Sequence, residues 1–422
     1  MSTALITPHI LSGSLDVPPS KSDTHRAIIC ALLAQDISEI YPIDISNDIM
    51  ATINAAKSLG AFVQIVSNRL IIDSRSAFCK NYITLNCYES GSTLRFLIPV
   101  VCAHGIDAHF EGLNSLNNRP INVYTDVLPK FGVECISNGT LPLTVSGKLS
   151  AGKFYIPGNV SSQFITGLLF SLPILNNDSE IIFTTSVESI GYIDMTIKTM
   201  AEFGVKIIKT DSGFKIPGNQ KYHAKKYHVE GDWSQAAFFM AAGALSGPVK
   251  IYGLDTNSPQ GDKAITKLLY RMGADIRYDD NCITVSAGKL SGINIFSAQI
   301  PDLIPILSVL GACSNGTTRI FGASRLKYKE SDRLRSIYNG LSKLGVNVIE
   351  TDDGLLIEGK PNFNKTTLDG FNDHRIVMAF SIAAIKSTGR ICISGAEHIS
   401  KSYPSFFEDY NKLGGIVDVI DI

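Results

Sequence analysis

The segment KLGVNVIETDDGLLIE, residues 343–358, contains the pattern from which the fold class of this chain follows. A helical stretch ends in an apolar residue and a glycine, and two alternating strands follow with a polar turn between them. Similar segments begin at Ser58, Lys130, Glu202 and Arg271, and a truncated copy, KLGGIVDVI, begins at Lys412. The chain therefore contains an internal repeat.

A glycine marks the same point in each copy. Glycine at the end of a helix readily adopts the left-handed conformation that turns the chain into the next strand. A unit of about 70 residues is longer than the common solenoid repeats, so six copies predict two domains of three α+β units each. The marker glycines are Gly60, Gly132, Gly204, Gly273, Gly345 and Gly414, with separations of 72, 72, 69, 72 and 69 residues.

The length of the chain, 422 residues, also favours two domains over a single core. Residues 1–19 contain a strand-like segment outside the repeats, and we expect it to pair with the truncated last copy. Both termini would then lie in one domain of residues 1–19 plus 229–422, with an inserted domain of residues 20–228. We expect the crossing between them in the Lys-, His- and Gly-containing stretch 217–227.

The composition is that of an ordinary globular protein, with 45% hydrophobic and 18% charged residues. A formal net charge of −1 argues against a surface that coats nucleic acid, so any basic site must be local. The cysteines are dispersed without a CxxC pair, and no HExxH motif or paired Cys/His spacing occurs. We therefore expect reduced thiols and no metal site.

The N-terminal residues 1–16 lack the charged-then-apolar pattern of a signal peptide. The longest apolar runs, residues 164–175 and 303–313, are shorter than the ~20 residues that a membrane span needs. We expect a cytoplasmic protein with no membrane or nucleic-acid partner.

The segment PPSKSDTHRA, residues 18–27, predicts a helix that begins at an anion site. Ser20 or Ser22 can cap the helix, and the free N–H groups of its first turn favour a bound anion. Ser22 and Arg26 lie one turn apart on one face, with Lys21 at the start. A capped helix with solvent-facing charges is an equally good interpretation of this segment alone.

Two further helix starts offer neutral donors. ESGSTLRF, residues 89–96, has small residues around Gly91 that let the backbone approach a ligand. SSQF, residues 161–164, places three donors before an apolar helix. Capping alone explains both segments about as well, and Arg119 in the motif NRPI could be an ordinary surface residue.

The C-terminal half contributes charged clusters. In RLKYKESDRLR, residues 325–335, helical spacing would place Lys329 and Arg333 on one face. An exposed amphipathic helix with salt bridges is the alternative. The motif NDHR, residues 372–375, begins an apolar helix, and Lys401 lies in SKSYP.

Taken in order, these segments resemble the EPSP synthase family of enolpyruvyl transferases, over residues 15–407. The resemblance implies an α/β (α+β), two-domain, inside-out barrel-like fold with three βαβαββ-type repeats in each domain. The motifs that carry it are PPSKSDTHRA at Pro18, ESGSTLRF at Glu89, NRPI at Asn118, SSQFITGLL at Ser161, GDWSQAAFF at Gly231, IPD at Ile300, KYKESDR at Lys327, FNDHR at Phe371 and SKSYPSF at Ser400.

The resemblance implies transfer of the enolpyruvyl group of phosphoenolpyruvate to the 5-hydroxyl of shikimate 3-phosphate, giving EPSP and phosphate by addition–elimination. This reaction belongs to the shikimate pathway of aromatic amino-acid biosynthesis. It implies no cofactor, a monomer, and glyphosate as a candidate inhibitor, since Gly91 is retained. Shikimate 3-phosphate would be bound by Lys21, Ser22, Arg26, Ser161, Ser162, Gln163, Ser189, Tyr192, Asp302, Arg325 and Lys329.

The same comparison implies the remaining roles. Asp302 would take the proton of the 5-hydroxyl, and Glu330, with Lys21 and Lys401, would serve proton transfer to the methylene carbon. The chain departs from the common family pattern at Glu89, Phe96 and Arg325. Phosphoenolpyruvate would be bound by Lys21, Gly91, Ser92, Arg119, Gln163, Arg333, Arg375 and Lys401.

Charge supports this division, because the two substrates together bring about six negative charges near neutral pH. Candidate cations to compensate them come from both halves of the chain, so we expect an active site in a cleft between the domains that closes on substrate. The nine cations are Lys21, Arg26, Arg95, Arg119, Arg325, Lys329, Arg333, Arg375 and Lys401.

Two alternatives remain open at this point. One is the sister enzyme that transfers enolpyruvate to UDP-N-acetylglucosamine, whose lysine motif continues with Asn and whose loop carries a Cys before its Arg-Pro pair. Here Ser22 follows Lys21, and residues 112–118 contain no Cys. The other is a non-catalytic anion-binding protein with the same repeats.

Overall fold

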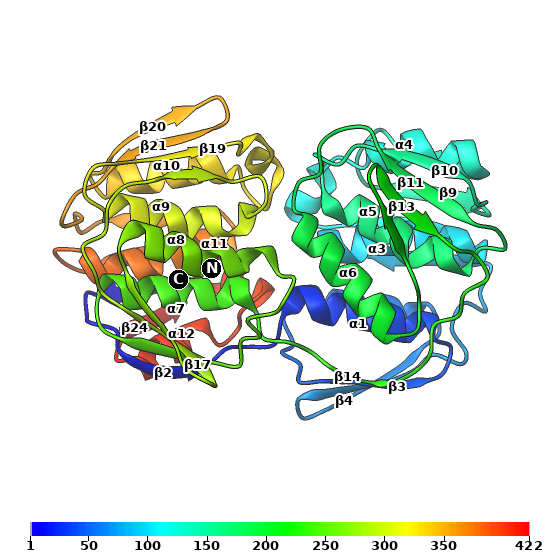
Figure 1. Ribbon diagram of the computed structural model, residues 1–422, viewed down its shortest axis with the longest axis horizontal. Coiled ribbons are helices and arrows are strands. Elements are labelled where there is room, and N and C mark those ends of the chain that lie inside the picture. Colours follow the sequence, from blue (N-terminus) through cyan, green and yellow to red (C-terminus); the bar gives the residue numbers. More distant parts are fainter. Residues whose placement is uncertain (1, 422) are drawn as a thin grey trace. The chain divides into compact units, whose positions relative to one another are not determined.

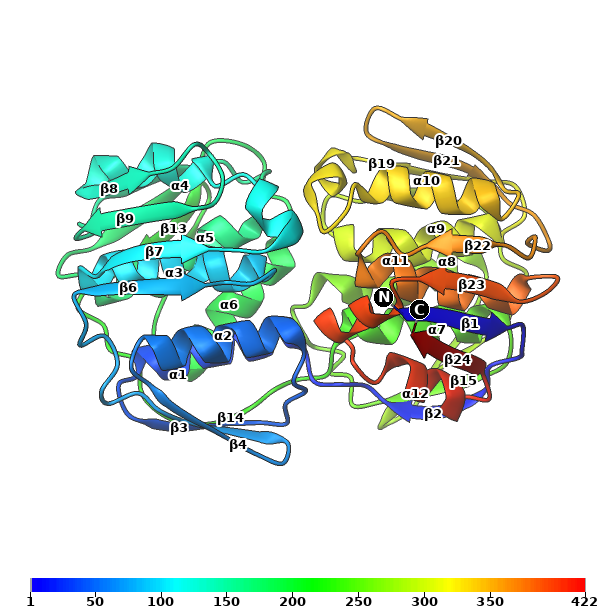
Figure 2. The ribbon, with the colours of Figure 1, turned by 180° about the vertical axis from the view of Figure 1, so that it is seen from behind.

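A computed structural model describes residues 2–421 of the chain. Met1 and Ile422, which the sequence assigned to the domain with both termini, lie outside the described residues. Two compact units are present, one of Met1–Pro18 with Glu230–Ile422 and one of Pro19–Val229. Each unit contains three four-stranded sheets together with a set of helices (Figures 1 and 2).

In the unit Pro19–Val229 the sheets have the orders β14-β3-β5-β4, β6-β7-β9-β8 and β10-β11-β13-β12. The helices are α1 (Lys21–Leu33), α2 (Asn47–Ser58), α3 (Gly91–His104), α4 (Asn122–Val127), α5 (Ser162–Ser171) and α6 (Ile190–Glu202). The strands are β3 (Ile37–Tyr41), β4 (Phe62–Val66), β5 (Arg69–Asp73), β6 (Tyr82–Asn86), β7 (Asp107–Glu111), β8 (Val133–Ile136), β9 (Leu143–Gly147), β10 (Lys153–Ile156), β11 (Ser179–Phe183), β12 (Ile208–Thr210), β13 (Gly213–Ile216) and β14 (Lys226–His228).

In the other unit the sheets have the orders β16-β17-β15-β2, β18-β19-β21-β20 and β22-β23-β1-β24. The helices are α7 (Trp233–Leu245), α8 (Ala264–Met272), α9 (Ile304–Ala312), α10 (Arg333–Lys343), α11 (His374–Ala383) and α12 (Phe406–Lys412). The strands are β1 (Ser2–Thr7), β2 (Gly13–Asp16), β15 (Val249–Tyr252), β16 (Asp275–Tyr278), β17 (Cys282–Ser286), β18 (Asn294–Phe296), β19 (Thr317–Phe321), β20 (Asn347–Thr351), β21 (Gly354–Glu358), β22 (Thr367–Asp369), β23 (Ile391–Ser394) and β24 (Ile416–Asp421).

The predicted helix–glycine–hairpin repeat is confirmed. In five copies a helical segment leads through the marker glycine into an antiparallel strand pair, as in β4–β5 and β20–β21. Positive φ angles at all six glycines, from +79° at Gly345 to +107° at Gly273, show why no residue with a side chain fits there easily. A Cβ at Gly60 would also lie 2.6 Å from the carbonyl oxygen of Ser76.

The last copy lacks a second strand, and the N-terminal strand takes that place. β1 pairs antiparallel with β24, with Ser2 opposite Asp421, which confirms the predicted pairing of the two ends. The two strands accordingly lie side by side (Figure 2).

The predicted position of the crossing, residues 217–227, was wrong. β14 follows this stretch but still belongs to the unit Pro19–Val229, because it pairs in parallel with β3. The chain leaves that unit between Val229 and Glu230.

Helices form the interior of each unit, and the sheets lie around them (Figures 1 and 2). Every residue of α7, α9 and α11 is buried, and these three helices contact one another. Helices that are apolar on all sides need this position, whereas each sheet needs only one apolar face. The predicted mixed α/β class with its six repeats is confirmed, and all six four-stranded sheets within residues 2–421 are open.

Candidate functional site

The start of α1 is organised as an anion site by its cap and first residue. The Ser20 side chain accepts a hydrogen bond of 3.3 Å from the backbone N–H of Asp23. Lys21, the first helical residue, forms an ion pair of 2.7 Å with Asp48 on α2. This carboxylate fixes the ammonium group at the helix N-terminus, where a bound anion is favoured by the helix dipole.

Arg26 contacts two other residues, Ser22 and Tyr192, that the sequence assigned to the same ligand. Its guanidinium donates to the carbonyl oxygen of Ser22 over 2.5 Å, to that of Tyr192 over 2.8 Å and to the hydroxyl of Thr196 over 2.9 Å. Burial lowers the pKa of Arg26 to about 10, although Asp23 opposes the shift. The guanidinium remains protonated near neutral pH and holds α1 against α6.

Gly91 lies close beneath two guanidinium groups. A Cβ built at this position would approach Arg95 Nη1 to 3.0 Å, Arg119 Nη1 to 3.1 Å and Gln163 Oε1 to 3.3 Å. Gln163 connects the starts of α3 and α5, since it accepts from Arg95 over 2.7 Å and donates to Ser92 over 3.0 Å. Four of the predicted site residues, namely Gly91, Ser92, Arg119 and Gln163, are thus brought together.

A buried chain of hydrogen bonds lies behind these helix starts. His25 Nδ1 and the Thr52 hydroxyl are 2.7 Å apart, and the Thr52 and Thr93 hydroxyls are also 2.7 Å apart. Thr93 then donates to the hydroxyl of Ser90, the N-cap of α3, over 2.7 Å. This chain fixes α1, α2 and the start of α3 relative to one another within their unit.

The other predicted residues of this unit lie at the starts of α5 and α6. Ser161 caps α5 through the backbone N–H of Gln163, and Ser162 is the first residue of that helix. Ser189 precedes α6 in the left-handed conformation, with a φ of 55°. A non-glycine residue there is uncommon and often marks a functional constraint.

In the other unit, Arg333 is the centre of an ion-pair network. Its side chain is 1% exposed and lies 2.8 Å from each of three carboxylates, those of Asp302, Glu330 and Asp373. Asp373 also caps α11 through the backbone N–H of Arg375. The carboxylates raise the pKa of Arg333 against the opposing effect of burial.

Asp302 lies where three cations of the predicted site converge. Arg375 and Lys329 approach it to 3.4 Å and 3.7 Å, in addition to Arg333. Burial alone would raise the pKa of Asp302, but Arg375, Lys329 and Arg333 hold it well below its usual range. Burial lowers the pKa of Lys329 to about 8, with Asp302 opposing the shift.

Two further predicted cations lie on 3-10 helices of the same unit. Arg325, in the 3-10 helix Ser324–Tyr328, donates to the carbonyl oxygen of Ala298 over 2.5 Å. Lys401, the last residue of the 3-10 helix Ala396–Lys401, is buried. Arg325 is thus held by the loop before the 3-10 helix that carries Asp302.

The departure at Phe96 has a packing explanation. Its ring is buried, packs edge-on against Phe170 at 5.4 Å and lies 5.4 Å below the Arg26 guanidinium. An aromatic ring there supplies a cation–π contact to a guanidinium whose other partners are neutral oxygens. Glu89 accepts a hydrogen bond from Asn114 in the 3-10 helix before Arg119.

Several residues of this machinery were not singled out as site residues from the sequence. Asp48 and Asp373 hold the predicted cations, and Arg95 contacts Gln163, although it was counted only among the candidate cations. Asp373 stands inside the quoted motif FNDHR as a helix N-cap. For Asp48 the only local signal is an acidic residue in the first turn of a helix capped by Ser46.

A buried carboxylate, Asp262, was also missed. One of its oxygens accepts a hydrogen bond from Ser234, and the other has no partner among residues 2–421. Burial, together with the charge of Asp302, raises the pKa of Asp262 to about 7, against the effect of Arg375. It lies within electrostatic reach of the Asp302 cluster.

Known proteins match this chain over nearly its full length. A profile described as EPSP synthase (3-phosphoshikimate 1-carboxyvinyltransferase) matches residues 6–410. The chain belongs to the EPSP synthase family. The predicted family and transferase class are thereby confirmed. Membership favours this transferase activity over the UDP-N-acetylglucosamine enzyme and over a non-catalytic anion-binding protein.

Curated relatives of EPSP synthase type agree. The 3-phosphoshikimate 1-carboxyvinyltransferase of Clostridium novyi is 45% identical, with 99% of each chain covered. That of Clostridium kluyveri is 44% identical, with 98% of this chain and 97% of the relative covered.

Solved structures match the whole fold. An EPSP synthase from Acinetobacter baumannii aligns with a TM-score of 0.84 and 25% identity over 100% of both chains. The enolpyruvyl transferase NikO from Streptomyces tendae aligns with a TM-score of 0.81 over 99% of this chain and 98% of its own, and at 17% identity it supports the fold alone.

None of the helices within residues 2–421 is both long enough and apolar enough to span a membrane. No group of three or more His, Cys, Asp or Glu side chains suited to a metal ion occurs in that part of the chain.

Proposed function

We propose that this EPSP synthase family member transfers the enolpyruvyl group of phosphoenolpyruvate to the 5-hydroxyl of shikimate 3-phosphate. The hydroxyl oxygen bonds to the central carbon of phosphoenolpyruvate while the methylene carbon gains a proton. The carbon–oxygen bond to phosphate then breaks, and the methyl group returns a proton to restore the double bond. The observation that carries the proposal is the Asp302 cluster, an acid–base pair of carboxylates set among cations.

The cations divide the binding task. Shikimate 3-phosphate is assigned to the starts of α1, α5 and α6 and to Lys329, and phosphoenolpyruvate to Gly91, Arg119 and Arg375. The support is local: Arg26 joins Ser22 to Tyr192, and Gln163 joins Ser92 to Arg95. Arginine offers a planar fork that suits both phosphate and carboxylate.

Asp302 accepts the hydroxyl proton in this proposal, and its surroundings suggest how it becomes basic. Arg375, Lys329 and Arg333 hold its pKa low in the absence of substrate. The same three cations are assigned to substrate anions. When they turn to those anions, Asp302 loses part of its compensation and its proton affinity rises toward that needed of a base.

Glu330 is assigned to protonate the methylene carbon, together with Lys21 and Lys401. Glu330 lies 2.8 Å from Arg333, which lies equally far from Asp302. One guanidinium therefore neutralises both the proposed acid and the proposed base.

We propose further that both units supply cations to the same pair of substrates and close on them in a cleft. Each unit holds part of the assigned set, with Lys21 and Arg119 in one and Asp302 and Arg375 in the other. The chain is proposed to act as a cytoplasmic monomer, with glyphosate as a candidate inhibitor at the phosphoenolpyruvate subsite. Small-angle scattering that shows no compaction with shikimate 3-phosphate plus an inert phosphoenolpyruvate analogue would count against closure.

Phosphate release by the purified protein tests the activity. It is expected to require shikimate 3-phosphate and phosphoenolpyruvate together. UDP-N-acetylglucosamine is expected not to replace shikimate 3-phosphate, and release with the nucleotide sugar would overturn the proposal. Product identification by NMR separates EPSP formation from simple hydrolysis of phosphoenolpyruvate.

A further inference from the structure

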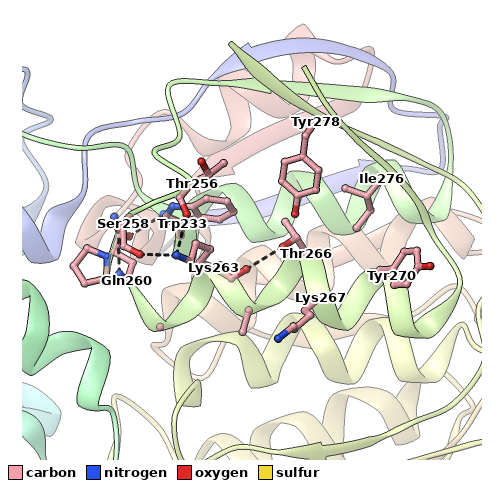
Figure 3. Close-up of a pocket in the computed structure, with 13 residues that line it drawn as sticks. Trp233, Thr256, Ser258, Gln260, Lys263, Thr266, Lys267, Tyr270, Ile276 and Tyr278 are labelled. Carbon is pink, nitrogen blue, oxygen red and sulfur yellow. Dashed lines mark hydrogen bonds between the residues drawn. The ribbon is translucent and has the colours of Figure 1, made fainter. Parts of the chain in front are cut away.

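A pocket of about 760 Å³ opens in the unit Met1–Pro18 with Glu230–Ile422, and none of the residues assigned to catalysis lines it (Figure 3). Residues of α8, of β16 and of the loop 256–261 line it, and Trp233 of α7 lies among them. This volume lies within the range of small-molecule sites.

Apolar atoms form most of the wall. Tyr270 of α8 and Tyr278 of β16 line the pocket and are 72% and 58% exposed, and Ile276 lies on the same strand (Figure 3). Large exposed aromatics are costly to leave in water and commonly mark a contact surface. Rings at this position offer flat faces to a planar ligand.

The charge of the lining has one sign. Its side chains include Lys263 and Lys267 and, in the described part of the chain, no Asp or Glu. Lys263 donates to the carbonyl oxygens of Thr256 and Ser258, both over 2.9 Å, so its charge is fixed beside the loop. Lys267 is exposed one helical turn later and forms no hydrogen bond or ion pair within residues 2–421.

The loop wall is held in place by hydrogen bonds. Gln260 accepts from the backbone N–H of Trp233 over 3.0 Å and donates to Glu230 over 2.9 Å. Ser258 also donates to Glu230, over 2.7 Å. A wall fixed in this way needs little ordering when a ligand binds, which favours affinity.

We propose that this pocket binds a planar aromatic molecule that carries one anionic group, with its ring against Tyr270 and Tyr278 and the anion at Lys267. The site is separate from the proposed enolpyruvyl transfer. Its test reads binding alone and does not depend on that activity.

Trp233 makes the pocket directly observable, because it is the only tryptophan of the chain. The probe is 8-anilinonaphthalene-1-sulfonate, an aromatic sulfonate whose emission is excited by energy transfer from tryptophan. N-phenyl-1-naphthylamine is its matched control without the sulfonate. We expect saturable transfer from Trp233 and roughly three- to fivefold weaker binding of the neutral probe, the effect of one exposed charge pair.

Variants localise the signal. Lys267→Met is expected to weaken binding of the sulfonate by about three- to fivefold and to leave the neutral probe unchanged. Lys343→Met, an exposed lysine at the end of α10, is the matched control and is expected to change neither. Tyr278→Ala should weaken binding of both probes, and because Tyr278 is exposed the substitution should leave the fold intact.

The proposal is overturned by any of three results. They are the absence of saturable transfer, equal sulfonate affinity in the two lysine variants, and displacement of the probe by shikimate 3-phosphate plus phosphoenolpyruvate. The last result would assign the probe to the substrate site.

Discussion

Arg333 and Asp302 form an ion pair of 2.8 Å in which the guanidinium is 1% exposed and the carboxylate 16% exposed. The carboxylate of Asp302 is therefore mostly buried, and the cations around it hold its pKa low. The same cations determine whether it can act as a base, and this dependence leads to the first prediction.

Asp302→Asn keeps the shape of the side chain and removes its basicity. Turnover is expected to fall by about 10²–10⁴-fold, the usual contribution of a general base. Calorimetry should still detect shikimate 3-phosphate, because Asn retains hydrogen-bonding capacity toward Arg333 and the neighbouring cations remain. Retention of more than a tenth of wild-type kcat would show that another group takes the proton.

Arg333→Met tests how far the network depends on its central cation. The change leaves the carboxylates of Asp302, Glu330 and Asp373 without their shared partner, and removal of one side of a buried ion pair typically costs about 3–5 kcal/mol. Urea unfolding measures the loss. Arg335→Met is the matched control: Arg335 is 60% exposed and pairs with Glu350 over 3.0 Å, so its loss should cost at most about 1 kcal/mol. Similar costs for both variants would contradict the prediction.

Lys329 predicts how substrate affinity depends on pH. Its pKa of about 8 in the free protein means that the charged form predominates below pH 8 and is lost above it. Affinity for shikimate 3-phosphate, measured by calorimetry, should therefore fall as pH rises through about 8. The substrate phosphate does not titrate there, because its second pKa is near ~6. Lys329→Arg keeps its charge and should remove this fall; an unchanged pH profile in that variant would refute the assignment.

The raised pKa of Asp262 predicts that the stability of the folded protein falls as pH rises. Its pKa is raised from 3.8 to about 7 in the folded protein, so the folded state binds the proton more tightly than the unfolded state. The resulting stabilisation is full below pH 3.8 and is lost as pH rises to about 7. Asp262→Asn removes this titration while keeping an acceptor for Ser234. Between pH 5 and pH 8, urea unfolding should show the variant gaining stability relative to wild type by up to about 3 kcal/mol; a difference that stays constant with pH would contradict it.

The repeat and its caps could be predicted from sequence because they are local. Glycine after a helix and a polar pair between alternating strands act within a few residues, and the positive φ of Gly60 and Gly345 shows the conformation they encode. The crossing at Val229–Glu230 was misplaced because it depends on the pairing of β14 with β3, in which Lys226 lies opposite Glu39, 226 − 39 = 187 residues earlier.

The site was predictable to the same extent. Residues in helix starts, such as Lys21 and Arg375, stood out by their capping pattern and by resemblance. Their partners did not, since Asp48 and Asp262 come from other elements and acquire meaning only through packing. Spacing along one chain does not reveal which buried carboxylate meets which cation.

Thr52 links the two helix starts assigned to different substrates, and its hydroxyl supplies the last prediction. Thr52→Val keeps the volume but breaks the chain between His25 and Thr93. The start of α3, with Gly91 and Ser92, then loses a buried support worth about 1–3 kcal/mol. We expect KM for phosphoenolpyruvate to rise roughly five- to tenfold, because displacement of binding groups weakens positioning.

Steady-state kinetics with each substrate varied separately distinguish a displaced start of α3 from a general loss of stability. KM for shikimate 3-phosphate should change less, since Arg26 and Tyr192 are held by a hydrogen bond to each other that does not involve Thr52. Thr52→Ser restores the hydroxyl and should restore KM for phosphoenolpyruvate. Ser171→Ala removes another buried hydroxyl of the same unit, one that donates a hydrogen bond to the carbonyl oxygen of Leu168 in its own helix. This control variant should leave both KM values unchanged. Equal rises in both KM values for Thr52→Val, or no rescue by serine, would mean that the chain stabilises the fold without positioning the start of α3.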